Sequence, residues 1–261
     1  WRDYLGGLGG RVGAVVQRLC ARVPQRAFCF SELHAVRLRK AGLRGSVTVL
    51  RGLYAGTAEP VFSRPTDPLV LFAGRLIAEK QATLGVAAIA LAATRIEGLR
   101  GEFLGDGPER AALEQAISEH GLDEVVSAPG FADAKTVDAE MRAAMCMLLP
   151  SRREGYGMVV VEAAARGTPS VVVAGEDNAA TELIEEGVNG TIAPRSDPQA
   201  VAEAIVRVHG AGLALRERTA AWFVQNAGQL SLESSLRAVL EGYTTGGAPR
   251  APSDSNAFDA P

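Results

Sequence analysis

From Leu69 onward the chain repeats one unit, which consists of a short apolar segment, a loop that contains glycine, and a segment with the apolar spacing of a helix. Short buried strands that alternate with helices are typical of a parallel β-sheet covered by helices on both faces. The repeat therefore predicts an α/β fold with a doubly wound parallel sheet of the Rossmann-like kind. Ligands of such domains bind at the carboxyl ends of the strands.

The elements of this domain follow from the apolar pattern and from the glycines and prolines at their ends. Strands and helices are predicted in alternation, the strands at 69–73, 101–104, 125–128, 146–149, 170–174 and 191–193, and the helices at 83–95, 108–120, 135–144, 158–166, 179–186 and 198–208.

Residues 1–64 predict a smaller α/β part, with strands at 26–31 and 46–51 and helices at 11–22 and 32–41. Two strands are too few to close a sheet of their own, so we expect the terminal part of a second α/β domain.

The chain is accordingly expected to divide into four segments. These are the second-domain part at 1–51, a linker rich in glycine and proline at 52–68, the main α/β domain at 69–245, and a disordered tail at 246–261. The glycine-rich stretch at 5–10 precedes a helix, as a phosphate loop does. Because no apolar strand leads into it, we expect a flexible connector.

Charge is distributed unevenly along the chain. Residues 1–64 carry 11 Lys and Arg against 3 Asp and Glu, which leaves 16 against 27 for the remainder. Two interpretations stay open: a solvated basic face that docks onto the acidic remainder, and peripheral contact with an anionic membrane surface through residues 1–64. No nucleic-acid partner is expected, since the arginines are not interleaved with aromatic residues.

The three cysteines are widely spaced in apolar segments, which favours buried, reduced thiols and a cytoplasmic location. Peripheral attachment to the inner membrane face is the alternative. No apolar run approaches the roughly 20 residues of a membrane span. The three histidines are scattered, so we expect no metal site.

The candidate site lies in the loops that follow the first four strands of the main domain. These loops contain Gly74 to Lys80, Gly105-Asp106-Gly107, Gly130-Phe131, and Pro150 to Gly157. Because the carboxyl ends of parallel strands meet at one edge of the sheet, the four loops should converge on one crevice.

Two cations and two carboxylates stand out in these loops. Arg75 and Lys80 could grip a diphosphate, one by bidentate contact and the other as a point charge. The alternative is a solvent-exposed pair of Glu79 with Lys80. Glu154 and Glu162 lie eight residues apart across a glycine-flanked helix start, where backbone N–H groups favour an anion. This spacing suits a phosphorylated sugar.

Taken together, the motifs resemble those of the retaining glycosyltransferases of family four (glycosyl transferase group one), which have the two-domain GT-B fold. The resemblance covers about residues 26–245 in order. It rests on Gly74-Arg75 with Glu79-Lys80, Gly105 to Arg110, Pro129 to Phe131, Pro150 to Gly157 with Glu162, and Asp177 to Gly190.

The resemblance implies that residues 69–245 bind a nucleotide-sugar donor and that 1–51 is the remnant of an acceptor domain. It implies catalytic contacts of Arg75 and Lys80 with the donor diphosphate and of Glu154 with the transferred sugar.

Substrate-binding positions follow from the same resemblance. Glu162 would hold the ribose. Backbone groups near Gly155, Tyr156, Gly157, Met158 and Val159 would hold phosphate and sugar, those near Gly130 and Phe131 the base, and Gly74, Gly105 and Asp106 would line the converging loops. The donor would be a UDP- or GDP-sugar and the acceptor an unknown glycan, lipid or small molecule, with no tightly bound cofactor.

Some family features differ or are absent from the pattern. Tyr156 stands where phenylalanine is commoner, and Gln81 stands where glycine is frequent; neither removes a charge. The family's donor-side histidine and glycine-rich loop from the N-terminal half have no counterpart here. We therefore expect this chain to carry half of an active site.

Three functions stay open at this point. The first is transfer of a sugar with retention of anomeric configuration. The second is a non-catalytic nucleotide-sugar-binding module that works with a separate acceptor domain, and the third is a nucleotide-sugar epimerase of the same fold. A dehydrogenase is disfavoured, because no G-x-G-x-x-G motif opens the first strand–helix turn.

Overall fold

The computed structural model describes residues 2–57 and 68–244. The chain forms two compact units: Leu53–Leu232 make up one, and the residues up to Gly52 together with those from Glu233 onward make up the other. Most of the predicted linker and the whole predicted tail lie outside the described residues. The functional division into donor and acceptor domains stays a prediction.

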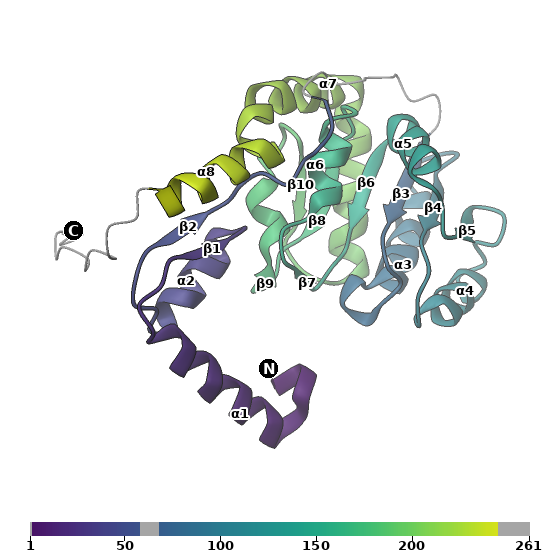
Figure 1. Cartoon of the computed structure of the whole chain (residues 1–261). Helices are drawn as coiled ribbons and strands as arrows, with labels where there is room; N and C mark the ends of the chain where they lie inside the picture. Colours follow the sequence, from purple (N-terminus) through teal and green to yellow (C-terminus); the bar gives the residue numbers. More distant parts are fainter. Residues whose placement is uncertain (1, 58–67, 245–261) are drawn as a thin grey trace, which may run out of the picture. The chain divides into compact units, whose positions relative to one another are not determined.

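The larger unit is built on a six-stranded parallel sheet in the order β10-β8-β6-β3-β4-β5 (Figure 1). This confirms the predicted doubly wound sheet. Its strands are β3 (Leu69–Ala73), β4 (Arg100–Leu104), β5 (Val126–Gly130), β6 (Cys146–Leu149), β8 (Ser170–Val173) and β10 (Gly190–Ala193).

Helices cover both faces of this sheet. On one face α3, α4 and the first half of α7 pack over Val70, Phe72 and Phe103, and the two phenylalanine rings stack 5.4 Å apart. On the other face α5 and α6 pack over Leu71 and Met147. The helices are α3 (Ala82–Ala93), α4 (Arg110–Glu119), α5 (Ala134–Ala143), α6 (Met158–Ala164) and α7 (Pro198–Leu230).

The last helix of this unit extends far beyond its predicted end at Val208. α7 continues to Leu230, with a break in helical geometry at Gly212 (φ 55°). Beyond this break α7 turns its apolar residues toward α6, where Phe223 packs with Val161. The break lies at a glycine because glycine adopts positive φ without a steric penalty from a Cβ atom. In the sequence, glycine at this place indicates the end of a helix, so the continuation of α7 was not predicted.

The site loops contain two short strands that the apolar pattern did not predict. β7 (Arg153–Glu154) pairs in parallel with β9 (Asp177–Asn178). The predicted helix at 179–186 is a shorter 3₁₀ helix, η2 (Ala179–Leu183).

The smaller unit pairs β1 (Ala27–Cys29) with β2 (Val47–Val49) in parallel and includes α2 (Glu32–Lys40). Two long helices, α1 (Arg2–Ala21) and α8 (Leu232–Thr244), complete this unit. In it the ring of Phe28 stacks against that of Tyr243 at 6.4 Å.

The expected flexible connector at residues 5–10 is wrong, because this stretch lies within α1, with non-helical geometry at Gly6 only. A helix with several glycines is intrinsically weak, which is why the sequence favoured a loop. The expectation of three buried thiols also needs correction: Cys29 and Cys146 are buried, but Cys20 is exposed on α1. In the described parts of the chain, no helix is both long and apolar enough to cross a bilayer.

Candidate functional site

Two strands that are distant in sequence lie side by side at the centre of the sheet. β3 pairs with β6, with Val70 opposite Cys146 and Leu71 opposite Met147. The order runs through β4 and β5 on one side and through β8 and β10 on the other, so the winding reverses between β3 and β6 (Figure 1). Doubly wound sheets bind ligands beyond the carboxyl ends of the strands at such a switch point. The loops after β3 and β6 line the candidate site.

The loops after β3 and β4 lock onto each other. The Gly74 N–H donates to the Leu104 carbonyl at 2.9 Å, and the Leu76 N–H donates to the Asp106 carbonyl at 2.9 Å. Gly105 has φ 145°, and a Cβ atom there would lie 1.8 Å from the Gly74 carbonyl oxygen. Only glycine fits this position. The structure therefore brings Gly74, Gly105 and Asp106 together.

Lys80 and Glu154, which come from the loops after β3 and β6, form an ion pair. Lys80 ends the short 3₁₀ helix η1 (Ala78–Lys80), and its Nζ lies 2.5 Å from Glu154 Oε2. Only 19% of the lysine side chain and 15% of the glutamate side chain are exposed. The alternative pairing of Glu79 with Lys80 is therefore not the contact that the structure contains.

Arg75, the second predicted cation, lies on the loop between β3 and η1. It is exposed, and no described residue forms a hydrogen bond or an ion pair with its side chain. The loop thus offers one paired cation and one guanidinium that is available to an anion.

The start of α6 is shaped by glycine. Gly157 has φ 96°, and a Cβ atom there would lie 2.6 Å from the Cβ of Ala180, so the turn packs directly against η2. Gly155 and Met158 are exposed, whereas Val159 is half-buried. Tyr156 is buried in an apolar cluster with Phe223.

Glu162 lies one turn into α6 and is half-buried. Its carboxylate has no hydrogen-bond or ion-pair partner among the described residues. Burial raises the pKa of Glu162, and the nearby positive charge of Arg166 opposes this rise. A half-buried carboxylate without a partner is unusual in a folded protein and favours a ligand that donates hydrogen bonds.

The predicted base-binding residues lie at the end of β5. The Phe131 side chain is 84% exposed. Gly130 has φ 98°, and the guanidinium of Arg110 fills the space that a side chain there would need. Since β5 lies two strands from β3, this end is about 10 Å from the β3 loop. That distance is within the span of a nucleotide.

Asn178 lies in the motif Asp177 to Gly190 and organises the site, although the sequence did not predict it as a site residue. Its buried amide donates to the carbonyls of Ser151 at 2.9 Å and Val173 at 2.8 Å, and its Oδ1 accepts the Ala180 N–H at 3.0 Å. It therefore holds the Glu154 loop against η2. In the sequence, the only indication of this role is that Asn178 comes shortly after an apolar strand.

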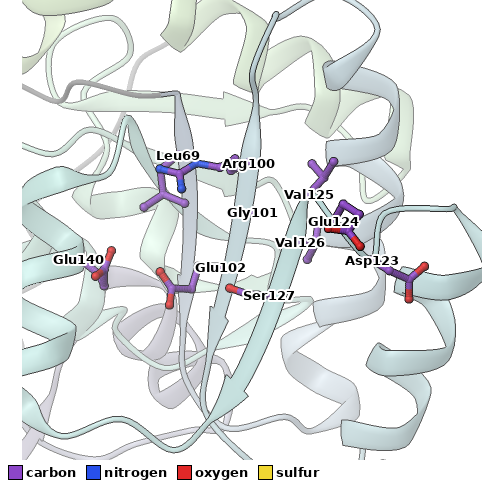
Figure 2. A pocket seen from close by; sticks show the side chains of 10 residues that line it. All are labelled: Leu69, Arg100, Gly101, Glu102, Asp123, Glu124, Val125, Val126, Ser127 and Glu140. Atoms are coloured by element: carbon purple, nitrogen blue, oxygen red, sulfur yellow. The ribbon is translucent and has the colours of Figure 1, made fainter.

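A separate cavity of about 470 Å³ lies at the opposite edge of the sheet, at the amino ends of β3, β4 and β5 (Figure 2). Glu102 on β4 and Glu140 on α5 face it, together with Arg100 and Ser127. Burial raises the pKa of Glu102, and the Glu140 carboxylate raises it further, against the effect of Arg100. None of the predicted site residues lines this cavity. Across residues 2–57 and 68–244, no three His, Cys, Asp or Glu side chains are arranged to hold one metal ion.

Known proteins resemble this chain in sequence and in fold. Residues 58–220, more than half of the chain, match the family described as glycosyl transferases group 1. Alpha-D-kanosaminyltransferase from Streptomyces kanamyceticus is 33% identical over 141 residues, which is 54% of this chain and 36% of that protein. The chain spans less than half the length of the curated relatives it matches.

Two solved structures show the same architecture. Sucrose-phosphate synthase from Thermosynechococcus elongatus superposes with a TM-score of 0.77 at 20% identity, over 91% of this chain and 62% of that chain. HepE from Anabaena in complex with UDP gives a TM-score of 0.75 at 21% identity, over 92% and 69%. The six-stranded parallel sheet is that of GT-B glycosyltransferases. With the match over residues 58–220, it follows that this chain belongs to the family of glycosyl transferases group 1.

Proposed function

We propose that this chain binds a nucleotide-diphosphate sugar at the carboxyl edge of β3 and β6 and forms the donor half of a retaining glycosyltransferase. The observation that carries the proposal is the contact between Lys80 and Glu154, which lie 74 positions apart in sequence and meet at the switch point of the sheet. A cation and a sugar-binding carboxylate at one point match a ligand with a phosphate joined to a hexose.

In this proposal Arg75 and Lys80 bind the diphosphate. Arginine offers a planar fork of donors and lysine a compact charge, and each charge-assisted hydrogen bond contributes about 1.5–3 kcal/mol. Backbone groups at Gly155 to Val159 complete the phosphate and sugar contacts, and Glu154 accepts hydrogen bonds from the sugar hydroxyls.

Glu162 receives the ribose. Ribose hydroxyls would give this half-buried, unpartnered carboxylate the donors it lacks among the described residues. The exposed ring of Phe131 and the backbone at Gly130 then hold the base at the end of β5.

The chemical step would leave the anomeric configuration unchanged. As the bond from the anomeric carbon to the diphosphate oxygen breaks, an oxocarbenium-like centre forms, and the acceptor attacks from the face that the nucleotide leaves. The leaving phosphate oxygen takes the acceptor proton. Arg75 and Lys80 would stabilise the charge that develops on the diphosphate, which is an electrostatic role. Glu154 positions the sugar and forms no covalent bond to it.

UDP is the first donor nucleotide to test, since the similar HepE structure contains UDP; GDP is the second. Because the chain spans less than half the length of its curated relatives, we propose that the acceptor is bound by polypeptide beyond the residues of this sequence. A binding module that works with a separate acceptor-binding protein would use the same donor site.

Calorimetric titration with UDP, GDP, UDP-glucose and GDP-mannose tests the binding proposal. We expect at least one of these to bind at micromolar to millimolar concentration, and no binding by any of them would contradict it. Analysis of the bound nucleotide sugar by NMR adds a second distinction. Conversion to a C2 or C4 epimer would favour the epimerase, whereas release of free sugar or transfer to an acceptor would favour the transferase.

We also propose that α1 contacts an anionic membrane surface. Its exposed apolar residues recur at spacings of three and four, as on one side of a helix, and arginines lie on the same helix. The apolar residues are Leu8, Val12, Val15, Val16 and Leu19, the arginines on the helix are Arg11 and Arg18, and Arg22 follows directly after the helix. Cosedimentation with phosphatidylglycerol vesicles should fall with added salt and with Leu8→Ser, and equal binding to phosphatidylcholine vesicles would contradict the charge contribution.

A further inference from the structure

The two cations of the candidate site differ in whether a carboxylate already neutralises their charge. The Lys80 ammonium is held by Glu154 at 2.5 Å in a largely buried pair, whereas Arg75 is exposed and has no partner among the described residues. An anion that enters this site therefore meets one available guanidinium and one ammonium that is already neutralised. The ion pair therefore affects which ligands the site accepts.

The position of Glu154 is set by the backbone on both sides of it. In the β7–β9 pair Glu154 lies opposite Asn178, whose buried amide holds the Ser151 carbonyl. The Ser151 hydroxyl donates to Glu154 Oε2 at 3.4 Å, the same oxygen that contacts Lys80. The pair is thus part of the folded architecture of the loop and does not depend on a freely rotating surface side chain.

The lysine loop is tied to the same segment. The Arg152 N–H donates to the Glu79 carbonyl at 2.9 Å, so a residue two positions before Glu154 is joined through the backbone to the residue that precedes Lys80. This hydrogen bond holds the two loops together. The ion pair then opens when one of the two side chains changes its rotamer or when a ligand displaces it.

A diphosphate and the Glu154 carboxylate compete for the same ammonium. The ammonium has three N–H donors, so it could contact both groups geometrically. Both groups are anions, however, and in a partly buried site the repulsion between like charges is screened less than in water. The carboxylate would have to move, and it would then need new hydrogen-bond donors.

We propose that Glu154 is the internal counter-ion of Lys80 in the empty site and that a sugar donor exchanges it. The diphosphate takes Lys80, and the displaced carboxylate accepts hydrogen bonds from the hydroxyls of the attached sugar. A nucleoside diphosphate without a sugar displaces the same carboxylate and offers it no donors. The ion pair thereby selects sugar-linked nucleotides over the free product nucleotide. This inference rests on the proposed function.

Calorimetry on the wild-type chain, Glu154→Gln and Glu79→Gln tests the exchange. Glu79 lies beside Lys80 on η1, so Glu79→Gln removes one negative charge from the same loop and leaves the ion pair intact. With UDP, we expect Glu154→Gln to bind at least about threefold more tightly than Glu79→Gln. The wild-type chain should bind UDP-glucose more tightly than UDP. In Glu154→Gln, the ratio of these two affinities should be much smaller. GDP and GDP-mannose serve in the same way if the site prefers guanine.

A double-mutant comparison separates the ion pair from general charge effects. In a Lys80→Met background, Glu154→Gln should tighten UDP binding less than it does when Lys80 is present, because only the repulsion between the carboxylate and the diphosphate is then removed. A gain of the same size with and without Lys80 would overturn the counter-ion assignment. So would a Glu154→Gln chain that binds UDP no more tightly than the Glu79→Gln chain.

A measurement that keeps the wild-type side chain of Glu154 covers the case in which Glu154→Gln perturbs the fold. The chain has three lysines, Lys40, Lys80 and Lys135, so ¹³C-methylation of the amines gives a simple NMR spectrum. The Lys80 signal, assigned by Lys80→Arg, should shift when UDP-glucose is added to the wild-type chain, and the other two should not. A Lys80 signal unchanged at saturation would overturn the exchange while leaving the proposed binding function intact. Failure of every nucleotide to bind would instead remove the proposed function itself.

Discussion

Arg216 on α7 donates a hydrogen bond of 2.6 Å to the carbonyl of Ala144, at the end of α5. The same guanidinium reaches the Thr168 hydroxyl at 3.0 Å and the carbonyls of Arg142 at 2.9 Å and Arg166 at 3.4 Å. The residue is 2% exposed, and burial lowers its pKa to about 10. The buried Arg216 side chain therefore donates hydrogen bonds to carbonyls at the carboxyl ends of α5 and α6, the two helices that cover the sheet face next to the site.

Replacement of Arg216 should strongly destabilise the larger unit. Arg216→Met leaves several buried carbonyls without donors, and we expect a loss of about 3 kcal/mol or more in the free energy of unfolding. Urea denaturation followed by circular dichroism measures this loss. Arg207→Met, at an exposed position of the same helix, should stay within about 0.5 kcal/mol of wild type. Equal stability of the two variants would contradict the role given to Arg216.

Glu162→Gln should raise stability and weaken nucleotide binding together. Burial raises the pKa of Glu162, so ionising this group at neutral pH opposes folding, and a neutral amide removes that cost. The amide is a poorer acceptor for ribose hydroxyls, and we expect about tenfold weaker UDP binding. Thermal melts at pH 7 and calorimetry check the two effects, with the exposed Glu217→Gln as the control. A loss of stability, or unchanged affinity, would contradict the ligand role of Glu162.

The Glu102 and Glu140 pair predicts a pH dependence of stability that is independent of the site. Because the pKa of Glu102 is raised in the folded chain, this carboxyl group stays protonated at pH values above 4.5, which is its ordinary pKa. Stability from this group is therefore present at low pH and is lost as pH rises from about 4.5 through the raised value. Glu102→Gln should melt at a higher temperature than wild type at pH 7 and at nearly the same temperature at pH 4. The exposed Glu124→Gln should show no such pH-dependent gap, and a gap that widens toward pH 4 would contradict the sign.

Gly105→Ala tests the close contact between the loops after β3 and β4. The new Cβ would lie 1.8 Å from the Gly74 carbonyl oxygen, so the two loops must separate. Gly121→Ala is the matched control, because Gly121 also has positive φ (64°) but nothing lies within 4 Å of a Cβ there. The control should lose about 1 kcal/mol from backbone strain alone. We expect Gly105→Ala to lose at least about 2 kcal/mol more and to weaken nucleotide binding, and equal losses in denaturation would contradict this contact.

Much of the sheet was predictable because its strands are short apolar runs. β3 and β6 were predicted with the bounds the structure shows, since Pro68 and Gly74 flank Leu69–Ala73 and Pro150 follows Cys146–Leu149. The long course of α7 was not, because Gly210 and Gly212 look like a helix end and the packing that continues it lies on α6.

The sequence predicts which loops form the site, but it does not predict which side chains contact each other there. Parallel topology brings the loops after β3 and β6 together, which explains why Arg75, Lys80 and Glu154 could be grouped from the sequence. The pairing of Lys80 with Glu154, and not with the adjacent Glu79, depends on the β7–β9 pair and on Asn178, which have no apolar pattern. The supporting role of Arg110 beside Gly130 likewise arises only from the folded arrangement.

The most direct test of the account is the affinity of UDP for Lys80→Met compared with Lys135→Met, measured by calorimetry beside the wild-type chain; GDP replaces UDP if the site prefers guanine. Lys135 is an exposed lysine on α5, so its loss changes the net charge equally without touching the candidate site. The account predicts that Lys80→Met weakens binding at least about tenfold, which corresponds to about 1.4 kcal/mol, while Lys135→Met binds like wild type. Equal affinities for the two variants would contradict a diphosphate site at Lys80.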